Sequence, residues 1–219
     1  MTCLSIIFDL DGTLLDTLVD LADTGNELLR EHDFPTHPTA AYKKFVGDGL
    51  QTLIKRIMPV GTEEFFIEKC CASFEERYSH NWKRNSCPYA GINDMVAALK
   101  MHGVKLAVLS NKPEAFTKLF VDEFFLRGQF SIVHGQRQGV PKKPDPTVAL
   151  AIAAQLGVHP QETLFVGDSG VDIKTGKAAE MLTAGVSWGF RSVQELAENN
   201  ADILVHNPLE LQQYVLSTI

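Results

Sequence analysis

Two hydrophobic patterns divide this chain into a helical stretch and a stretch in which helices alternate with strands. Between residues 18 and 82, apolar residues recur at spacings of three and four, which is typical of amphipathic helices. The pattern predicts helices over about 18–29, 40–45, 50–58 and 62–82, with prolines or glycines closing several of them. No strand pattern is present between residues 16 and 87.

The rest of the chain alternates short apolar runs with helical patterns. The runs predict strands at 104–109, 130–133, 163–166, 182–186 and 203–205. Helices are expected at 92–102, from a cap at 110–113 to about 125, at 147–156, up to 180, at 193–198 and from 208. Ile6–Phe8 is a further apolar run, of the kind that forms a strand buried on both faces. Such alternation predicts one parallel sheet with helices on both faces.

The predicted fold class is therefore α/β, a Rossmann-like parallel-sheet core with an inserted all-helical cap domain. The core would comprise residues 1–16 and 88–219, and the cap residues 17–87. Right-handed crossovers place the carboxyl ends of all strands at one edge of the sheet, where open α/β sheets bind ligands. Candidate catalytic residues should therefore directly follow the strands.

The composition is that of a globular protein, with 45% hydrophobic and 21% charged residues among 219. A net charge of -7 disfavours binding to nucleic acid or to anionic membranes, and no apolar run has the length of a transmembrane helix. Four cysteines without C-x-x-C spacing indicate buried free thiols in a reducing compartment. The first strand begins too early to leave room for a signal peptide, so we expect a cytoplasmic protein.

Two carboxylates follow the first predicted strand. Asp9 and Asp11 are two residues apart, so in an extended chain they point the same way. Buried carboxylates that lie together repel and need a cation or a shared proton, and oxygen ligands at a strand end suit Mg²⁺. The structural alternative is an Asx-turn at Asp11-Gly12 that simply leaves the strand.

A second pair of carboxylates follows the strand predicted at 163–166. That strand would deliver Asp168 to the same sheet edge as Asp9, and Asp172 comes one helical turn later. The alternative is an ordinary helix start, with Asp168 or Ser169 as the N-cap and Asp172 in the first turn.

Two further segments carry groups that suit a phosphate. Ser110 and Asn111 are predicted to open a helix, where free N–H groups and a hydroxyl bind anions, although Ser110 could be a plain N-cap. Lys143 directly precedes a proline in a stiff segment and could offset the carboxylates as a point charge. Its neighbour Lys142 is the rival for that role, and a solvated surface loop is the structural alternative.

In order along the chain, these strings resemble the four motifs of the haloacid dehalogenase (HAD) superfamily. The matching strings are Asp9-x-Asp11-Gly-Thr-Leu-x-Asp, the strand that ends at Ser110, Lys143-Pro-x-Pro and Gly-Asp168-x-x-x-Asp172. The resemblance implies that Asp9 is the nucleophile and Asp11 the general acid and base. It also implies Mg²⁺ held by Asp9, Asp168 and the main-chain carbonyl of Asp11. Asp172 is expected to orient these groups rather than to bind the metal.

The chain is most similar to HAD hydrolases with a helical cap, in particular the phosphoglycolate phosphatase-like branch. The resemblance implies hydrolysis of a small phosphorylated metabolite through an aspartyl-phosphate, with Lys143, Ser110 and Asn111 binding the phosphoryl group. Gly47, Asp48 and Gly49 match a cap loop that reaches the substrate, although a helix C-cap followed by an Asp N-cap explains the same residues. A sugar-phosphate mutase and a non-catalytic phosphate-binding regulatory protein stay open as alternatives. We expect a monomer or homodimer.

Overall fold

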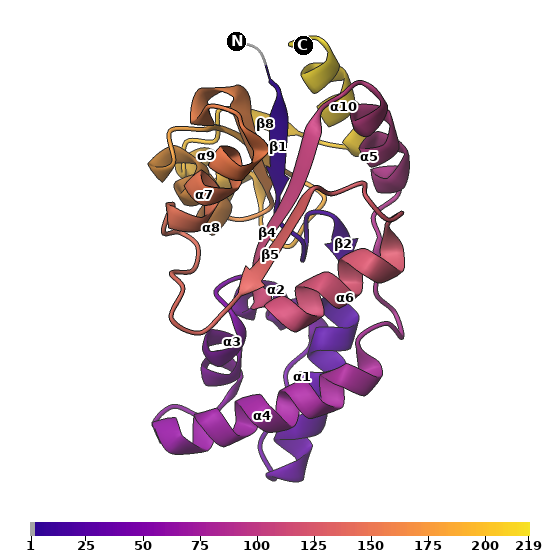
Figure 1. Cartoon of the computed structure of the whole chain (residues 1–219). Helices are drawn as coiled ribbons and strands as arrows, with labels where there is room; N and C mark the ends of the chain where they lie inside the picture. Colours follow the sequence, from indigo (N-terminus) through magenta and orange to yellow (C-terminus); the bar gives the residue numbers. More distant parts are fainter. Residues whose placement is uncertain (1–2) are drawn as a thin grey trace.

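The computed structural model describes residues 3–219 and contains a central sheet flanked by helices (Figure 1). Six parallel strands form this sheet in the order β5-β4-β1-β6-β7-β8. The strands are β1 (Ser5–Phe8), β4 (Lys105–Pro113), β5 (Ile132–Gln136), β6 (Thr163–Gly167), β7 (Leu182–Val186) and β8 (Ile203–Val205). The predicted α/β class with a parallel sheet is confirmed.

Strand β1 lies in the middle of the sheet, paired with β4 on one side and with β6 on the other. Ile6, Ile7 and Phe8 are fully buried. Ile6 and Phe8 pack in one apolar cluster, and Ile7 packs in a second cluster, because successive side chains of a strand point to opposite faces. Burial on both faces explains why this segment is an unbroken apolar run.

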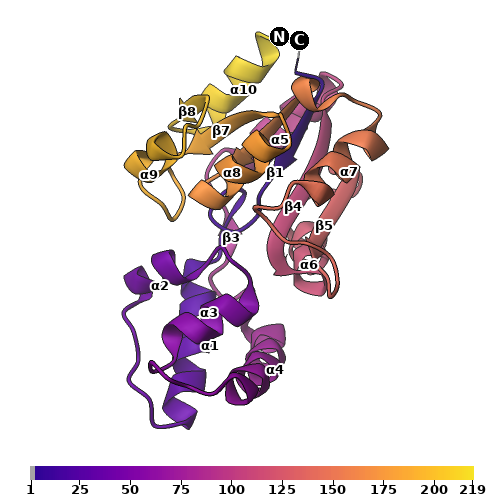
Figure 2. The same ribbon diagram turned by 90° about the vertical axis from the view of Figure 1, so that its left-hand side faces the viewer.

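Helices cover both faces of the sheet (Figure 2). The cluster around Ile6 and Phe8 includes residues of α5 (Ile92–Met101), α6 (Glu114–Phe124) and α10 (Pro208–Leu216). The cluster around Ile7 includes residues of α7 (Thr147–Leu156), and α8 (Gly170–Ala178) packs against β6 and β7. A 3-10 turn, η1 (Pro160–Glu162), precedes β6, and α9 (Val193–Glu198) contacts β7 and β8.

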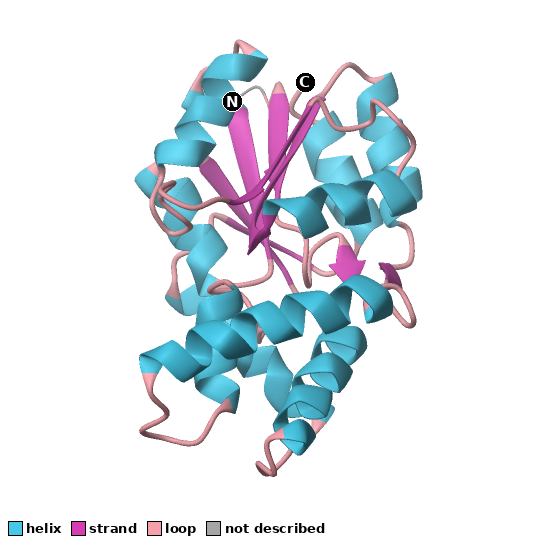
Figure 3. Cartoon of the chain, turned by 60° about the horizontal axis from the view of Figure 1, so that its bottom comes forward, coloured by secondary structure: helices cyan, strands magenta, loops and turns pink. Residues whose placement is uncertain are grey.

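Four further helices lie together beyond the carboxyl ends of the strands (Figure 3). They are α1 (Leu18–Glu31), α2 (Thr39–Phe45), α3 (Leu50–Ile57) and α4 (Glu64–Asn81). The chain enters and leaves this helical region through β2 (Leu15–Asp16) and β3 (Cys87–Pro88), which pair antiparallel. The boundaries predicted for the cap lie at this pair, and the division into core and cap domains stays a prediction.

The structure corrects the prediction that Ser110 and Asn111 open a helix. Strand β4 continues in an extended conformation through both residues to Pro113, and α6 begins only at Glu114. The residue that precedes a proline is disfavoured in the helical conformation, so Lys112 remains extended. Strand β5 lies at Ile132–Gln136 rather than at 130–133. The two-residue strands β2 and β3 were not predicted.

Within residues 3–219, no helix combines the length and the apolar character that crossing a membrane requires. The four cysteines are free thiols, as predicted, but only Cys3 and Cys70 are buried; Cys71 is half-buried and Cys87 is exposed, so the prediction of burial is wrong for these two.

Candidate active site

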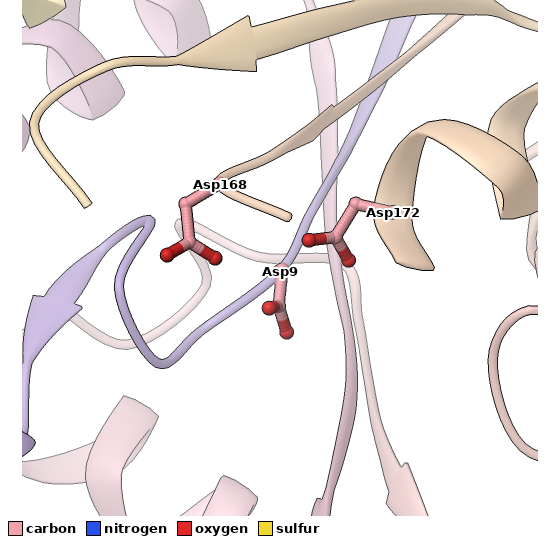
Figure 4. Close-up of side chains that lie close together, drawn as sticks. All are labelled: Asp9, Asp168 and Asp172. Atoms are coloured by element: carbon pink, nitrogen blue, oxygen red, sulfur yellow. The ribbon is translucent and has the colours of Figure 1, made fainter. Parts of the chain in front are cut away.

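Asp9 and Asp168 lie side by side at the sheet edge because they directly follow the neighbouring strands β1 and β6. The main-chain N–H of Asp9 donates to the carbonyl of Val166 at 2.9 Å, which extends the pairing of these strands by one residue. Asp172, in the first turn of α8, points to the same place (Figure 4). One carboxylate oxygen of each of the three residues lies within 4.8 Å of the others.

Lys143 places an ammonium group among these carboxylates. Its Nζ lies 2.8 Å from Oδ1 of Asp9 and 2.7 Å from Oδ1 of Asp172, and its side chain is only 2% exposed. Burial acts to lower the pKa of Lys143, but the two carboxylates outweigh burial and raise it. Its rival Lys142 instead donates to the main-chain carbonyl of Asp48 at 2.6 Å. The structure therefore brings Lys143, and not Lys142, to the carboxylates.

The carboxylates carry more negative charge than one ammonium can balance. Burial raises the pKa of Asp9 to about 7, with Asp172 and Asp11 adding to the effect and Lys143 opposing it. Burial and the charges of Asp172 and Asp9 raise the pKa of Asp168 well above its ordinary value. A set of desolvated oxygen ligands with surplus negative charge fits a hard divalent cation such as Mg²⁺.

Two glycines and a main-chain N–H shape the surroundings of Asp168. Its Oδ2 accepts from the N–H of Phe190 at 2.6 Å. A Cβ at Gly12 would lie 2.3 Å from that oxygen, and a Cβ at Gly189 would lie 2.3 Å from Cβ of Asp168. Gly12 also has a φ of +83°, which other residues rarely adopt. The turn after β1 can therefore approach Asp168 only with glycine at this position.

Asp11 is held by two side chains that sequence reasoning missed. Thr17 Oγ1 donates to its Oδ1 at 2.7 Å, and Lys112 Nζ donates to its Oδ1 and Oδ2 at 3.0 and 3.2 Å. The Lys112 ammonium also donates to the hydroxyl of Tyr78 on α4 at 3.1 Å and lies 4.5 Å from the ring centroid of Phe120. The only available signal was the alternation of β4, which puts Lys112 on the same face as Ser110.

The Asp172 carboxylate accepts hydrogen bonds from Ser169 and Lys143. Its Oδ2 accepts from the N–H and the hydroxyl of Ser169 at 3.1 and 2.7 Å, which forms a capping box at the start of α8. Its Oδ1 accepts from Lys143. The role of Asp172 in orienting other groups rather than binding the metal stays a prediction, and its carboxylate oxygen lies within 4.8 Å of those of Asp9 and Asp168.

A pocket of about 50 Å³ lies between the sheet edge and the helical region. Asp9, Asp11 and Ser110 line it from the sheet side, and Gly47 and Gly49 reach it from the loop between α2 and α3. The remaining lining from the helical region is apolar and consists of Leu21, Val46, Leu50 and Leu53. Asp48 does not line the pocket, because its carboxylate pairs with Arg56 at 2.6 Å.

Comparisons with known proteins place this arrangement in context. The family model of haloacid dehalogenase-like hydrolases matches residues 6–186. The phosphoglycolate phosphatase of Aquifex aeolicus is 35% identical over 185 residues, which cover 84% of this chain and 85% of that protein. The phosphoglycolate phosphatase of Pseudomonas putida KT2440 is 31% identical over 205 residues, which cover 91% and 75%.

A solved structure agrees with these relatives. A protein of Lactobacillus delbrueckii subsp. bulgaricus, provisionally assigned as a phosphoglycolate phosphatase, superposes with a TM-score of 0.92 at 29% identity. The superposition covers 98% of this chain and 99% of that one, so the similarity extends over the sheet and the helical region alike.

Proposed function

This chain belongs to the haloacid dehalogenase-like hydrolases, and on that premise we propose that it is a Mg²⁺-dependent phosphatase that cleaves a small phosphomonoester through an aspartyl-phosphate. One observation carries the proposal. Asp9 borders the pocket, and Asp168, Asp172 and the ammonium of Lys143 surround it at the edge of the sheet. This arrangement supplies a nucleophile, oxygen ligands for a divalent cation and a fixed positive charge in one desolvated place.

In the proposed first step, a carboxylate oxygen of Asp9 attacks phosphorus while the bond from phosphorus to the leaving oxygen breaks. Asp11 gives a proton to that leaving oxygen. In the second step, Asp11 takes a proton from a water molecule that attacks the aspartyl-phosphate, which releases inorganic phosphate and restores Asp9. Thr17 and Lys112 hold the Asp11 carboxylate in place for both proton transfers.

The remaining residues stabilise negative charge on the phosphoryl group. Asp9, Asp168 and the main-chain carbonyl of Asp11 would hold Mg²⁺, which when bound neutralises charge on the phosphoryl oxygens. Lys143 supplies a second positive charge that needs no reorganisation because it is already paired and buried. The hydroxyl of Ser110, a buried pocket residue, is proposed to bind the phosphoryl group.

The size of the pocket supports a compact leaving group. The pocket beside Asp9 is small, and leucines form most of its far side. Phosphoglycolate, the substrate in the names of the two relatives, is therefore the first substrate to test.

The test is phosphate release from a panel of esters with Mg²⁺ or with EDTA. The panel comprises phosphoglycolate, 2-hydroxyethyl phosphate, pyrophosphate, a nucleoside monophosphate and a sugar phosphate. We expect Mg²⁺-dependent release from the smallest esters and a loss of roughly 10³-fold or more in Asp9→Asn. Asp11→Asn should accumulate phospho-enzyme, because the base that activates water is missing.

Other outcomes of the same assay would point elsewhere. Isomerisation of a sugar phosphate without phosphate release would favour a mutase. Binding of phosphate without turnover of any ester would favour a regulatory protein. Near-normal turnover by Asp9→Asn would refute the covalent mechanism.

A further inference from the structure

Asn111 makes three side-chain hydrogen bonds that join two separate parts of the site. Its Oδ1 accepts from the main-chain N–H of Lys143 at 2.9 Å, and its Nδ2 donates to the carbonyl of Lys143 at 3.0 Å. The same Nδ2 donates to the carbonyl of Gly47 at 3.1 Å. The residue is buried, and both of its amide protons are used within the protein. The Asn111 side chain is therefore committed to the protein and has no proton free for a substrate.

The cap loop, which we define as residues 46–49 between α2 and α3, is attached to the sheet side through its carbonyl groups. Arg191 donates to the carbonyl of Val46 at 2.9 Å, and Lys142 donates to that of Asp48 at 2.6 Å. Asn111 binds the carbonyl between them. These donors come from β4, from the segment before α7 and from the segment after β7. Docking of the cap loop thus depends on three separate segments.

Among these three donors, Asn111 is the one whose side chain also holds the main chain of Lys143. Its two bonds to Lys143 fix the peptide groups on both sides of that residue's α-carbon. The Lys143 ammonium in turn lies within 2.8 Å of both Asp9 and Asp172. A shift of the Lys143 main chain would therefore move the ammonium away from the nucleophile.

We propose that Asn111 is a positioning residue that couples docking of the cap loop to the placement of Lys143 beside Asp9. The Gly47 carbonyl accepts one hydrogen bond from the Asn111 amide. This bond fixes the plane of the amide group, and with it the two hydrogen bonds to Lys143. Undocking of the loop would leave that buried amide proton without a partner, which is unfavourable. Because coupling between two sites is reciprocal, a ligand that orders Lys143 should also favour the docked loop. The inference rests on the proposed function for the role of Lys143 only.

Hydrogen exchange of the cap loop tests this coupling without any substrate. The probe is inorganic phosphate with Mg²⁺, and the measurement is exchange of peptides that span residues 44–53, followed by mass spectrometry. In the wild type, phosphate should slow exchange in these peptides by about fivefold or more, the lower end of typical coupling between sites. In Asn111→Ala, saturating phosphate should leave exchange in these peptides unchanged.

Arg191→Met is the matched control, because it removes a donor to the same loop and leaves Lys143 untouched. Its loop should exchange faster without phosphate yet still be protected by it. If Asn111→Ala does not fold, Asn111→Asp keeps the acceptor for the Lys143 N–H and lacks both donors. Neither Asn111→Ala nor Asn111→Asp should show protection of the cap loop by phosphate. In both variants kcat should fall roughly tenfold or more, while KM changes less.

Two results would overturn the proposal: protection by phosphate in Asn111→Ala and Asn111→Asp equal to that in the wild type, or absence of protection in the wild type. The exchange measurement is independent of turnover. A failure of the proposed phosphatase activity would show in the ester panel, and a failure of the coupling would show in the exchange data.

Discussion

Replacing Lys143 by methionine should destabilise the protein and make its folding more dependent on Mg²⁺. Methionine is similar in length, so the substitution removes the charge and little volume. Asp9 and Asp172 would then face each other without the ammonium that now lies between them. Asp172 is fully buried and the Asp9 side chain is 9% exposed, so solvent could not replace the lost charge.

The magnitude follows from this burial. Removing one member of a buried ion pair typically costs about 3–5 kcal/mol. In a chain of this size, 1 kcal/mol corresponds to roughly 2–4 °C, so the Tm should fall by about 6–20 °C in the absence of divalent ions. Mg²⁺ at about 100 times its Kd restores about 2.7 kcal/mol by mass action. The rise in Tm on adding Mg²⁺ should be larger in the variant, because no ammonium competes for the carboxylates.

The variant should also respond to pH in a defined direction. Burial raises the pKa of Asp9 to about 7, so the folded protein binds this proton more tightly than the unfolded chain does. Stability from this group is therefore present at low pH and is lost as pH rises from about 4 through 7. Without the Lys143 ammonium, more of this stability should be lost. The difference in free energy of unfolding between the wild type and Lys143→Met should therefore grow as the pH rises over that interval.

Thermal unfolding with EDTA, with Mg²⁺ and across pH measures all three effects. The control is Lys142→Met, which removes the exposed neighbouring lysine and its exposed hydrogen bond to the Asp48 carbonyl and should change the free energy of unfolding by only about 1 kcal/mol. Equal Tm values for the two variants in EDTA, or a smaller Mg²⁺ effect in Lys143→Met than in the wild type, would refute the reasoning.

Two further predictions concern the segment that leaves the helical region and the choice of substrate. Asp20→Ala should lower stability by about 3 kcal/mol relative to an Asp23→Ala control, because the Asp20 carboxylate accepts hydrogen bonds from Asn85 and Ser86. Burial acts to raise the pKa of Asp20, but these bonds outweigh it and lower the pKa, so the deficit should shrink as pH falls below about 4. Urea unfolding at several pH values measures both effects, and a deficit that does not change with pH would contradict them. Separately, kcat/KM for phosphoglycolate and for 2-hydroxyethyl phosphate, which has a hydroxyl in place of the leaving group's carboxylate, should agree within about tenfold; a preference of a hundredfold or more would contradict this expectation.

The sequence predicted the sheet and the positions of Asp9 and Asp168 well, for a physical reason. Both residues follow short apolar runs that are typical of buried parallel strands, and the carboxyl ends of such strands share one edge. The proline after Lys143 favoured it over Lys142, and Lys143 is the lysine that contacts Asp9. The superfamily and its hydrolase class, predicted from the motifs, are confirmed by the family match and the relatives.

Long-range contacts of polar residues were beyond the sequence. Asp20 looked like an ordinary polar position of α1, yet its partners lie 65 and 66 positions later in the chain. Lys112 was assigned to the cap of a helix, and a helix would have turned it away from Ser110. Because β4 instead stays extended, Ser110 and Lys112 share a face, and the lysine reaches Asp11. One misplaced helix start thus concealed a partner of the proposed acid and base.

The distribution of positive charge around the pocket explains why size rather than charge should select the leaving group. Four cations of the site and its cap-loop contacts already have acceptors: Lys143 has Asp9 and Asp172, Lys112 has Asp11, and Lys142 and Arg191 have carbonyls of the cap loop. A carboxylate on the leaving group could gain an ion pair only by drawing one of these groups from its partner. For Lys143 and Lys112 such an exchange returns little net free energy, because a desolvated carboxylate loses its partner, and Lys142 and Arg191 are not among the residues that line the pocket. The apolar lining from α1, α3 and the cap loop offers the leaving group contact but no charge. Discrimination among phosphomonoesters should therefore follow the volume that fits between these leucines and Asp9.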